Sequence, residues 1–209
     1  MHGQHSILST ERERLLVDQV QAGDRGALGE LLGAYHRRVY HLCLRMVSNS
    51  DDAAELSQEV LLRAIQHIDG FRGGSKFSTW LLRIAMNLTV SHLRRRKVRS
   101  AISLDLETGD GEAATPLRNM IASGREPKPS QSVEKKEEAV ELAAALESLD
   151  PSLKSIMLLR DVQQMDYQQI ADVLSLPIGT VKSRLFRARL ALRAALEGHA
   201  QKPTEVVDG

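Results

Sequence analysis

DYQQIADVLSLPIGTVKSRLFRARLALRAAL, residues 166–196, is the stretch that decides the architecture of the second half of this 209-residue chain. Asp166 and Gln169 have the Asp-x-x-Gln spacing of a capping box, which predicts the start of a short helix. The letters LPIG at 176–179 then predict a tight turn into a longer helix that ends near Leu196. A short helix, a tight turn and a basic helix together form the helix-turn-helix pattern.

The basic helix of this stretch has two different sides on a helical wheel. The apolar side should pack against the preceding helices, and it holds Val181, Leu185, Ala188, Leu192 and Leu196. The other side suits a major groove, where arginine donates a bidentate pair to guanine and an aromatic ring contacts a thymine methyl. The residues predicted to bind DNA there are Lys182, Ser183, Arg184, Phe186 and Arg187. In the alternative interpretation, Phe186 packs on the preceding linker helix and the arginines are solvated.

The first half of the chain has apolar residues at helical spacing almost throughout, and we find no convincing strand-like alternation. Breaks at 24–26, 48–50 and 69–75 separate about four expected helices. Ser50 or Asp51 is well placed to cap the helix that follows the second break. The pattern therefore predicts an all-helical bundle.

A polar, acidic segment separates the two helical parts. Residues 100–132 contain several glycines and prolines and lose the helical periodicity, so they are predicted to form a flexible linker. The expected fold class is all-α, with a four-helix domain at 8–99 joined by this acidic linker to a helix-turn-helix domain at 133–197. Residues 198–209 are expected to form a disordered tail.

The formal net charge of +1 hides an uneven distribution along the chain. Residues 1–99 carry a net +5, residues 100–150 a net −6 and residues 151–209 a net +2. Two basic ends around an acidic middle favour two surfaces that meet a phosphate backbone, although a charge run is also compatible with a solvated helix face.

The composition excludes several classes of protein. A single cysteine, Cys43, cannot form an internal disulfide, and no four-ligand zinc site can be drawn from it and seven scattered histidines. No apolar run approaches the roughly 18 residues of a membrane span. We therefore expect a cytoplasmic protein with no cofactor, no metal and no membrane insertion. No catalytic arrangement is identifiable either, so we expect no enzyme activity and no small-molecule substrate.

Three motifs resemble those of the extracytoplasmic-function sigma factors, the small two-domain class of bacterial transcription initiation factor. DAAELSQEV at 52–60 is similar to the segment that docks on the clamp helices of the largest RNA polymerase subunit. FRGGSKFSTWLLRIAMN at 71–87 is similar to the segment that melts and reads the −10 element. The helix-turn-helix residues at 167–171 and 176–189 are similar to the motif that reads the −35 element.

The resemblance implies a partner for each set of residues. The acidic-polar patch expected to bind core RNA polymerase consists of Asp52, Glu55, Gln58 and Glu59, and the polymerase flap is a further expected contact. The set expected to bind promoter DNA at −10 consists of Asn87, Ser91, His92, Arg94, Arg95 and Arg96. The family places a base-capturing pocket around Asn87 and the loop after it, and many members carry Asp where Ser91 stands. An anti-sigma factor that covers these surfaces is also expected.

Two other functions remain open at this point. A self-sufficient helix-turn-helix regulator, of the response-regulator effector type, shares the turn and basic helix but does not explain residues 51–99. An enzyme that modifies nucleic acid would need a cluster of acidic metal ligands, and the acids here are scattered or lie in the patch at 52–59. Phe77 and Trp80 are expected to pack the first bundle, the alternative being that they stack on bases.

Overall fold

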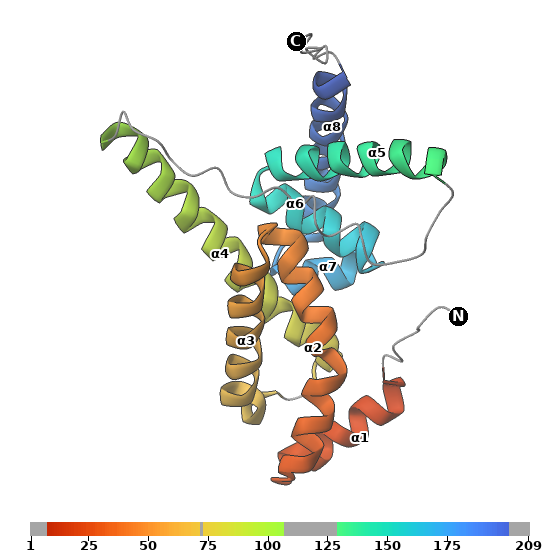
Figure 1. The fold of residues 1–209 in the computed structure, drawn as a ribbon. Coiled ribbons are helices and arrows are strands. Elements are labelled where there is room, and N and C mark those ends of the chain that lie inside the picture. The colour runs from red at the N-terminus through yellow and green to blue at the C-terminus, as the bar shows by residue number, and fades with distance from the viewer. Residues whose placement is uncertain (1–7, 72, 107–128, 201–209) are drawn as a thin grey trace.

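The structure is a computed structural model that describes residues 8–71, 73–106 and 129–200. Every regular element in those ranges is helical, which confirms the all-α prediction (Figure 1). The first module contains α1 (Thr10–Gln21), α2 (Arg25–Val47), α3 (Ser50–His67), the short 3-10 turn η1 (Ile68–Gly70) and α4 (Phe77–Leu106). The second module contains α5 (Pro129–Ser148), α6 (Pro151–Met157), the π-helical turn η3 (Leu158–Val162), α7 (Tyr167–Leu174) and α8 (Ile178–Ala200).

Side-chain caps begin most of these helices. Asp166 and Gln169 form the complete capping box that their spacing predicts, and Asp150 caps α6 ahead of Pro151. The prediction for α3 was wrong: Asn49, not Ser50 or Asp51, is the cap, and its amide oxygen accepts from the Asp51 and Asp52 N–H groups. Asn49 is extended whereas Ser50 is already helical, and only a residue in the extended conformation can turn its side chain onto the first free N–H groups.

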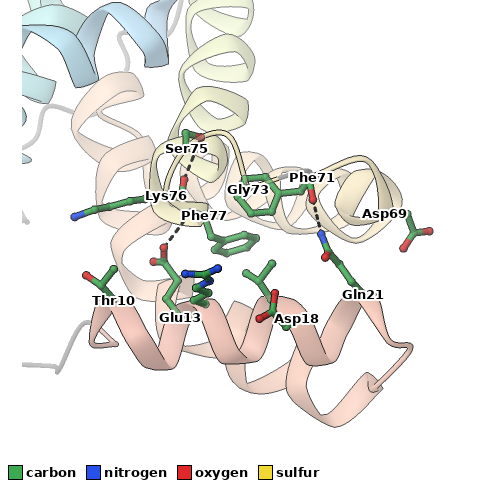
Figure 2. Close-up of a pocket in the computed structure, with 12 residues that line it drawn as sticks. Thr10, Glu13, Asp18, Gln21, Asp69, Phe71, Gly73, Ser75, Lys76 and Phe77 are labelled. Atoms are coloured by element: carbon green, nitrogen blue, oxygen red, sulfur yellow. Dashed lines mark hydrogen bonds between the residues drawn. The ribbon is translucent and has the colours of Figure 1, made fainter.

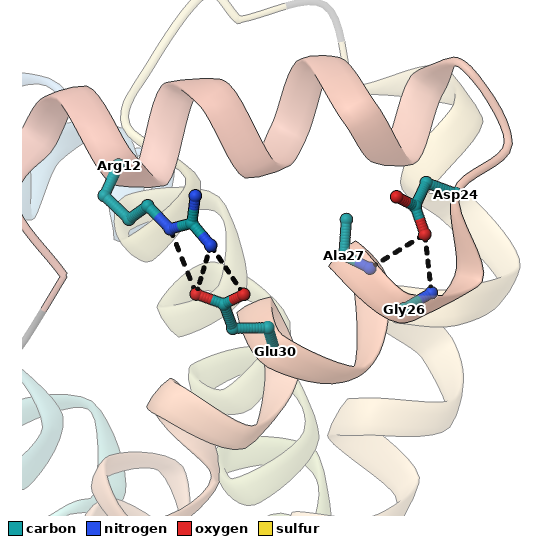
Figure 3. A network of polar contacts seen from close by, with 5 residues as sticks. All are labelled: Arg12, Asp24, Gly26, Ala27 and Glu30. Atoms are coloured by element: carbon teal, nitrogen blue, oxygen red, sulfur yellow. Dashed lines mark hydrogen bonds and ion pairs between the residues drawn. The ribbon is translucent and has the colours of Figure 1, made fainter.

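Polar contacts also fix the first two helices against each other (Figure 3). Arg12 of α1 makes a forked pair with Glu30 of α2, with Nη2 2.7 Å from Oε2 and Nε 3.0 Å from Oε1. Asp24 caps α2 by accepting from the N–H groups of Gly26 and Ala27. The forked geometry favours one orientation of α1 relative to α2, although exposed ion pairs of this kind stabilise a fold by only about 1 kcal/mol or less.

Two helices extend beyond their expected ends. α4 continues to Leu106 rather than stopping near Arg99, and Figure 1 shows its C-terminal half projecting away from α2 and α3. α5 begins at Pro129 instead of Val133. The predicted linker conformation at 107–128 and most of the predicted tail lie outside the described residues, so the domain boundaries remain predictions.

Aromatic rings form the centre of the first module. Phe77 is 1% exposed and its ring contacts those of Tyr35, Phe71 and Trp80 at 5.5–5.9 Å between centroids. This confirms that Phe77 and Trp80 pack the bundle. Glu13 is also buried there, accepting hydrogen bonds from the Tyr35 hydroxyl and, at 3.0 Å, from the Phe77 N–H. These bonds satisfy a carboxylate that would otherwise be costly to bury.

Candidate nucleic-acid and polymerase interfaces

The exposed face of α8 carries four of the five residues predicted to bind at −35, and Arg184 lies at its edge. Val181, Leu185 and Ala188 are buried, as the wheel predicts, and hold the helix against the module. On the other side Phe186 is 65% exposed, which contradicts the alternative that it packs on another helix. Lys182, Ser183 and Arg187 are exposed as well, and Arg184 is partly buried. α8 therefore presents a basic surface with a protruding aromatic ring.

Neighbouring side chains orient part of this face. The Lys182 ammonium lies 6.0 Å from the centroid of the Tyr167 ring, and the Arg160 guanidinium lies 5.2 Å from the same centroid. Arg189 pairs with Asp161 at 3.5 Å, which ties α8 to the π-helical turn. The start of α7 and the end of η3 thus support α8.

The acidic patch on α3 is present, but its four members differ in their surroundings. Glu55 and Gln58 are exposed, whereas Glu59 accepts from Arg63 Nε at 2.7 Å on the same helix. Asp52 is partly buried because it faces α4, where His92 Nε2 is 3.3 Å and Arg96 Nη1 is 3.9 Å away. Leu56 and Val60 are core residues, as expected.

Two apolar residues extend this patch and were missed by sequence reasoning. Leu62 is 54% exposed and Ile65 is 45% exposed, and they lie four and seven residues after Gln58. This spacing puts them on the same side of α3 as Gln58. Their helical spacing from Gln58 is the signal that would have revealed them.

The residues predicted to bind at −10 divide between two sides of α4. Asn87, Ser91, Arg94 and Arg95 are exposed and follow one another at intervals that keep them on one face of the helix. His92 and Arg96 instead turn toward Asp52 of α3. The loop expected after Asn87 is not present, because α4 continues through this position to Leu106 without a break.

A groove of about 900 Å³ opens between α1 and the segment at 69–77 (Figure 2). Glu13, Asp18 and Gln21 approach it from α1, and Phe71 and Lys76 lie on the opposite wall. Gln21 donates to the Phe71 carbonyl across the groove. Asn87 does not line this groove, so it is separate from the exposed face of α4.

The remaining polar candidates do not form a chemical site. Burial raises the pKa of the Cys43 thiol to about 12, which keeps it protonated and unreactive. Burial, followed by the charges of Arg37 and Arg45, lowers the pKa of His41. Within the described ranges, no three His, Cys, Asp or Glu side chains group as metal ligands, and no helix is long and apolar enough to cross a membrane.

Comparison with known proteins identifies the family of this chain. Sigma-70 region 2 matches residues 31–99, and sigma-70 region 4 matches residues 139–192. The ECF RNA polymerase sigma factor SigW of Bacillus subtilis is 33% identical over 180 residues, which are 86% of this chain and 94% of SigW. This chain belongs to the extracytoplasmic-function sigma factors. The sigma factor is thus a non-enzymatic subunit that directs RNA polymerase to promoters, as its motifs predicted.

Other relatives agree with this placement of the sigma factor. The RNA polymerase sigma-H factor of Pseudomonas aeruginosa is 32% identical over 195 residues, 91% of this chain and 97% of that protein. Among solved structures, CnrH in complex with the cytosolic domain of CnrY covers 90% of the sigma factor and 98% of its own chain, with a TM-score of 0.61 at 21% identity. Sigma factor RpoE in complex with the anti-sigma factor NepR, from Bartonella quintana, covers 80% and 95%, with a TM-score of 0.59 at 24% identity. At these identities the two structures show the fold alone.

Proposed function

We propose that the two modules of this sigma factor divide its work between polymerase and the two promoter elements. Asp52, Glu55, Gln58 and Glu59 on α3 dock on the clamp helices of the largest subunit, and the second module docks on the flap. The supporting observation is that surfaces of opposite character are exposed on different helices: acidic and apolar on α3, basic and aromatic on α8. An acidic face repels DNA, so a protein partner suits α3 better.

At the −35 element, α8 enters the major groove with Phe186 and Arg187 facing the bases. Arg187 donates to a guanine edge and Phe186 contacts a thymine methyl. Lys182 and Arg184 contact phosphates, which set the register of the helix without reading sequence. Ser183 is restricted in this position, because its hydroxyl donates to the Thr180 carbonyl at 3.1 Å and keeps only its acceptor sites for a base.

At the −10 element, the exposed face of α4 holds the single strand that forms when the duplex opens. Asn87 and Ser91 offer hydrogen bonds to a base edge, while Arg94 and Arg95 hold the backbone electrostatically. His92 and Arg96 contribute after they separate from Asp52. Extracting a base costs a few kcal/mol, which such edge contacts offset.

An anti-sigma factor is a further proposed partner. The similar RpoE of Bartonella quintana was solved with the anti-sigma factor NepR, and an inhibitor of that kind would act on the exposed surfaces of α3 and α8. Promoter recognition also places the action of this protein in the cytoplasm, with polymerase and DNA.

Reconstitution with purified core polymerase tests the proposal. We expect the full chain to bind core polymerase, to start transcription at promoters with −35 and −10 elements, and to leave those promoters silent when it is omitted. A chain that binds promoter DNA tightly by itself and never directs initiation would be a self-sufficient helix-turn-helix regulator. Sequencing the transcripts would identify the two elements.

A further inference from the structure

The exposed side of α3 combines two large apolar side chains with acidic ones. Leu62 is 54% exposed and Ile65 is 45% exposed, although the opposite side of the same helix packs in the bundle. Glu55 and Glu59 precede Leu62 by seven and three residues, so they share its side of the helix. Apolar side chains that are grouped on a surface and bordered by charge are typical of a protein-protein contact.

The exposed side of α8 has the same composition with the opposite charge. Phe186 is 65% exposed and Leu190, one turn later, is 52% exposed. Lys182 lies one turn before Phe186 and Arg193 two turns after it, and both are exposed on this side. Leu190 has no role in the proposed DNA contact, because it lies a turn beyond the base-facing residues and a leucine cannot bond a phosphate. A protein surface suits this apolar pair better.

The charges that border the two surfaces are able to change partners. Glu59 pairs with Arg63 at 2.7 Å and Arg193 pairs with Glu197 at 3.1 Å, each within its own helix. Exposed pairs of this kind contribute little to stability, so both groups can leave their partners at little cost. An acidic, apolar surface on α3 and a basic, apolar surface on α8 are therefore complementary.

The two surfaces belong to one chain but cannot meet within it. Leu62 and Phe186 are exposed at the same time. Figure 1 shows α3 in the lower part of the molecule and α8 in its upper part, in different modules. A contact between the two surfaces therefore requires two chains, and a second copy of this protein supplies both the matching charge and the matching apolar pair.

We propose that this sigma factor associates with itself, with Leu62 and Ile65 of α3 in one copy packing against Phe186 and Leu190 of α8 in another. Because two different surfaces meet, the contact is heterologous, and the copies form either a closed ring or an open chain. Four partly exposed apolar side chains make a small contact, of the class that buries less than about 1,200 Å² in total and forms transiently.

Self-association would compete with both proposed partners of the sigma factor. The contact covers the part of α3 that is proposed to dock on core polymerase and the part of α8 that is proposed to read the −35 element. Free chains at high concentration would be kept from both, and polymerase that binds the single chain would dissociate the assembly by mass action. This consequence rests on the proposed function, whereas the association itself does not.

Sedimentation equilibrium of the full chain measures the association. We expect the weight-average mass to rise above the 23.2 kDa of one chain as the concentration increases from about 1 to about 100 μM. We also expect the association constant to fall by about threefold or more when salt is raised from about 0.1 to about 0.5 M, because the charges are exposed and screened. A mass that stays at 23.2 kDa throughout would overturn the proposal.

Two substitutions distinguish this contact from other modes of association. Leu62→Lys sets a cation against the basic α8, and Phe186→Glu sets a carboxylate against the acidic α3, so each variant alone should remain a single chain. A one-to-one mixture should associate again, because the first variant keeps its α8 surface and the second keeps its α3 surface. Leu15→Lys on α1 and Val140→Glu on α5 replace exposed apolar residues elsewhere, and these controls should associate as the parent does.

Association of either variant by itself would overturn the proposal, since α3 or α8 would then be dispensable. Ile65→Lys takes the place of Leu62→Lys if circular dichroism shows that the latter has lost helix. Titration with core polymerase separates this proposal from the proposed function. A chain that associates as expected but never binds polymerase refutes the proposed function alone, and a chain that binds polymerase but never self-associates refutes the association alone.

Discussion

His92 Nε2 on α4 lies 3.3 Å from Asp52 Oδ2 on α3, so one carboxylate of the proposed polymerase patch contacts the proposed −10 set. The approach does not meet hydrogen-bond geometry, since His92 Nε2 has no hydrogen-bond partner among the described residues. Arg96 approaches the same oxygen at 3.9 Å. A substitution at Asp52 therefore changes both surfaces at once, and Glu55 is the better residue with which to test polymerase binding alone.

Reversal of the Glu55 charge should weaken polymerase binding. Glu55 is exposed, so Glu55→Arg should reduce affinity for core polymerase by about tenfold or more through repulsion. Its effect on the free energy of unfolding should stay within about 0.5 kcal/mol. Titration of core polymerase measures the first quantity and denaturant unfolding the second. Glu141→Arg, at an exposed position of α5, changes the net charge by the same amount and is the control. If both variants lose the same affinity for core polymerase, α3 is not part of the interface.

Two substitutions on α8 should separate base reading from phosphate binding. Arg187→Ala should relax the preference at one −35 position, at a cost of about 1–3 kcal/mol for the favoured base. Lys182→Ala should instead weaken binding to all −35 sequences by a similar factor. It should also reduce the magnitude of the slope of log affinity against log salt concentration by about 1. Promoter-variant competition with the holoenzyme measures both effects. Unfolding of both variants would mean that the exposed face of α8 has been misassigned.

Asn87→Ala should impair promoter opening more than promoter binding. Asn87 is exposed on α4 and is proposed to meet a base only after the strands separate, so the closed promoter complex should form normally. The ratio of open to closed complexes, measured by the reactivity of unpaired thymines, should fall by about tenfold, equivalent to about 1.4 kcal/mol. Thr89→Ser, at a buried position on the same helix, is a control for changes in α4 itself. Equal opening by parent and Asn87→Ala would exclude a base contact.

The buried Glu13 should matter for stability and not for recognition. Glu13→Ala leaves the Tyr35 hydroxyl and the Phe77 N–H without their acceptor and should lower the free energy of unfolding by about 2–4 kcal/mol. Tyr35→Phe removes only one of the two bonds, so its loss should be smaller. Chemical denaturation of the full chain measures both changes. Exposed Glu11→Ala is the control, and a Glu13→Ala chain as stable as that control would contradict the network.

The contact between the two modules should strengthen as pH rises above 8. Lys154 of α6 is buried against the Met46 carbonyl of α2, and this burial lowers its pKa to about 8, with the Glu147 charge opposing the effect. When the modules separate, Lys154 is hydrated and returns toward its ordinary pKa of about 10.4, so the separated state binds more protons between these values. The ratio of packed to separated chains should therefore rise by up to about tenfold per pH unit across this window.

A distance between spin labels at Ala34→Cys on α2 and Ala194→Cys on α8, two exposed positions, tests the pH effect when it is measured from pH 7.5 to 9.5. Glu147 and Arg96 are the other charged residues that line the cavity beside Lys154. Lys154→Met removes the titrating group, and its ratio of packed to separated chains should not change with pH. The same slope in Lys154→Met and in the parent would assign the effect to another group.

Much of the site could be predicted because it depends on local spacing. Phe186 and Arg187 project from α8 because Val181 and Leu185 must face inward, and the spacing of Asp166 and Gln169 was enough to predict the capping box. The division of the −10 set between two sides of α4 could not be predicted from the sequence. His92 and Arg96 turn toward α3 only because the start of α3 lies beside α4, and because α4 continues as a helix past Asn87.

The sequence by itself determined the class of the protein: two helical modules, a helix-turn-helix and three motifs in the order of the sigma factors. Hydrophobic periodicity, caps and turns act within a few residues, so they can be read from neighbouring letters. Only the tertiary structure decided that Lys154 would be buried against Met46 and that Arg38 would meet Gln163. Those contacts join residues more than a hundred positions apart, and nothing local distinguishes a lysine that pairs with a distant helix end from one that is solvated.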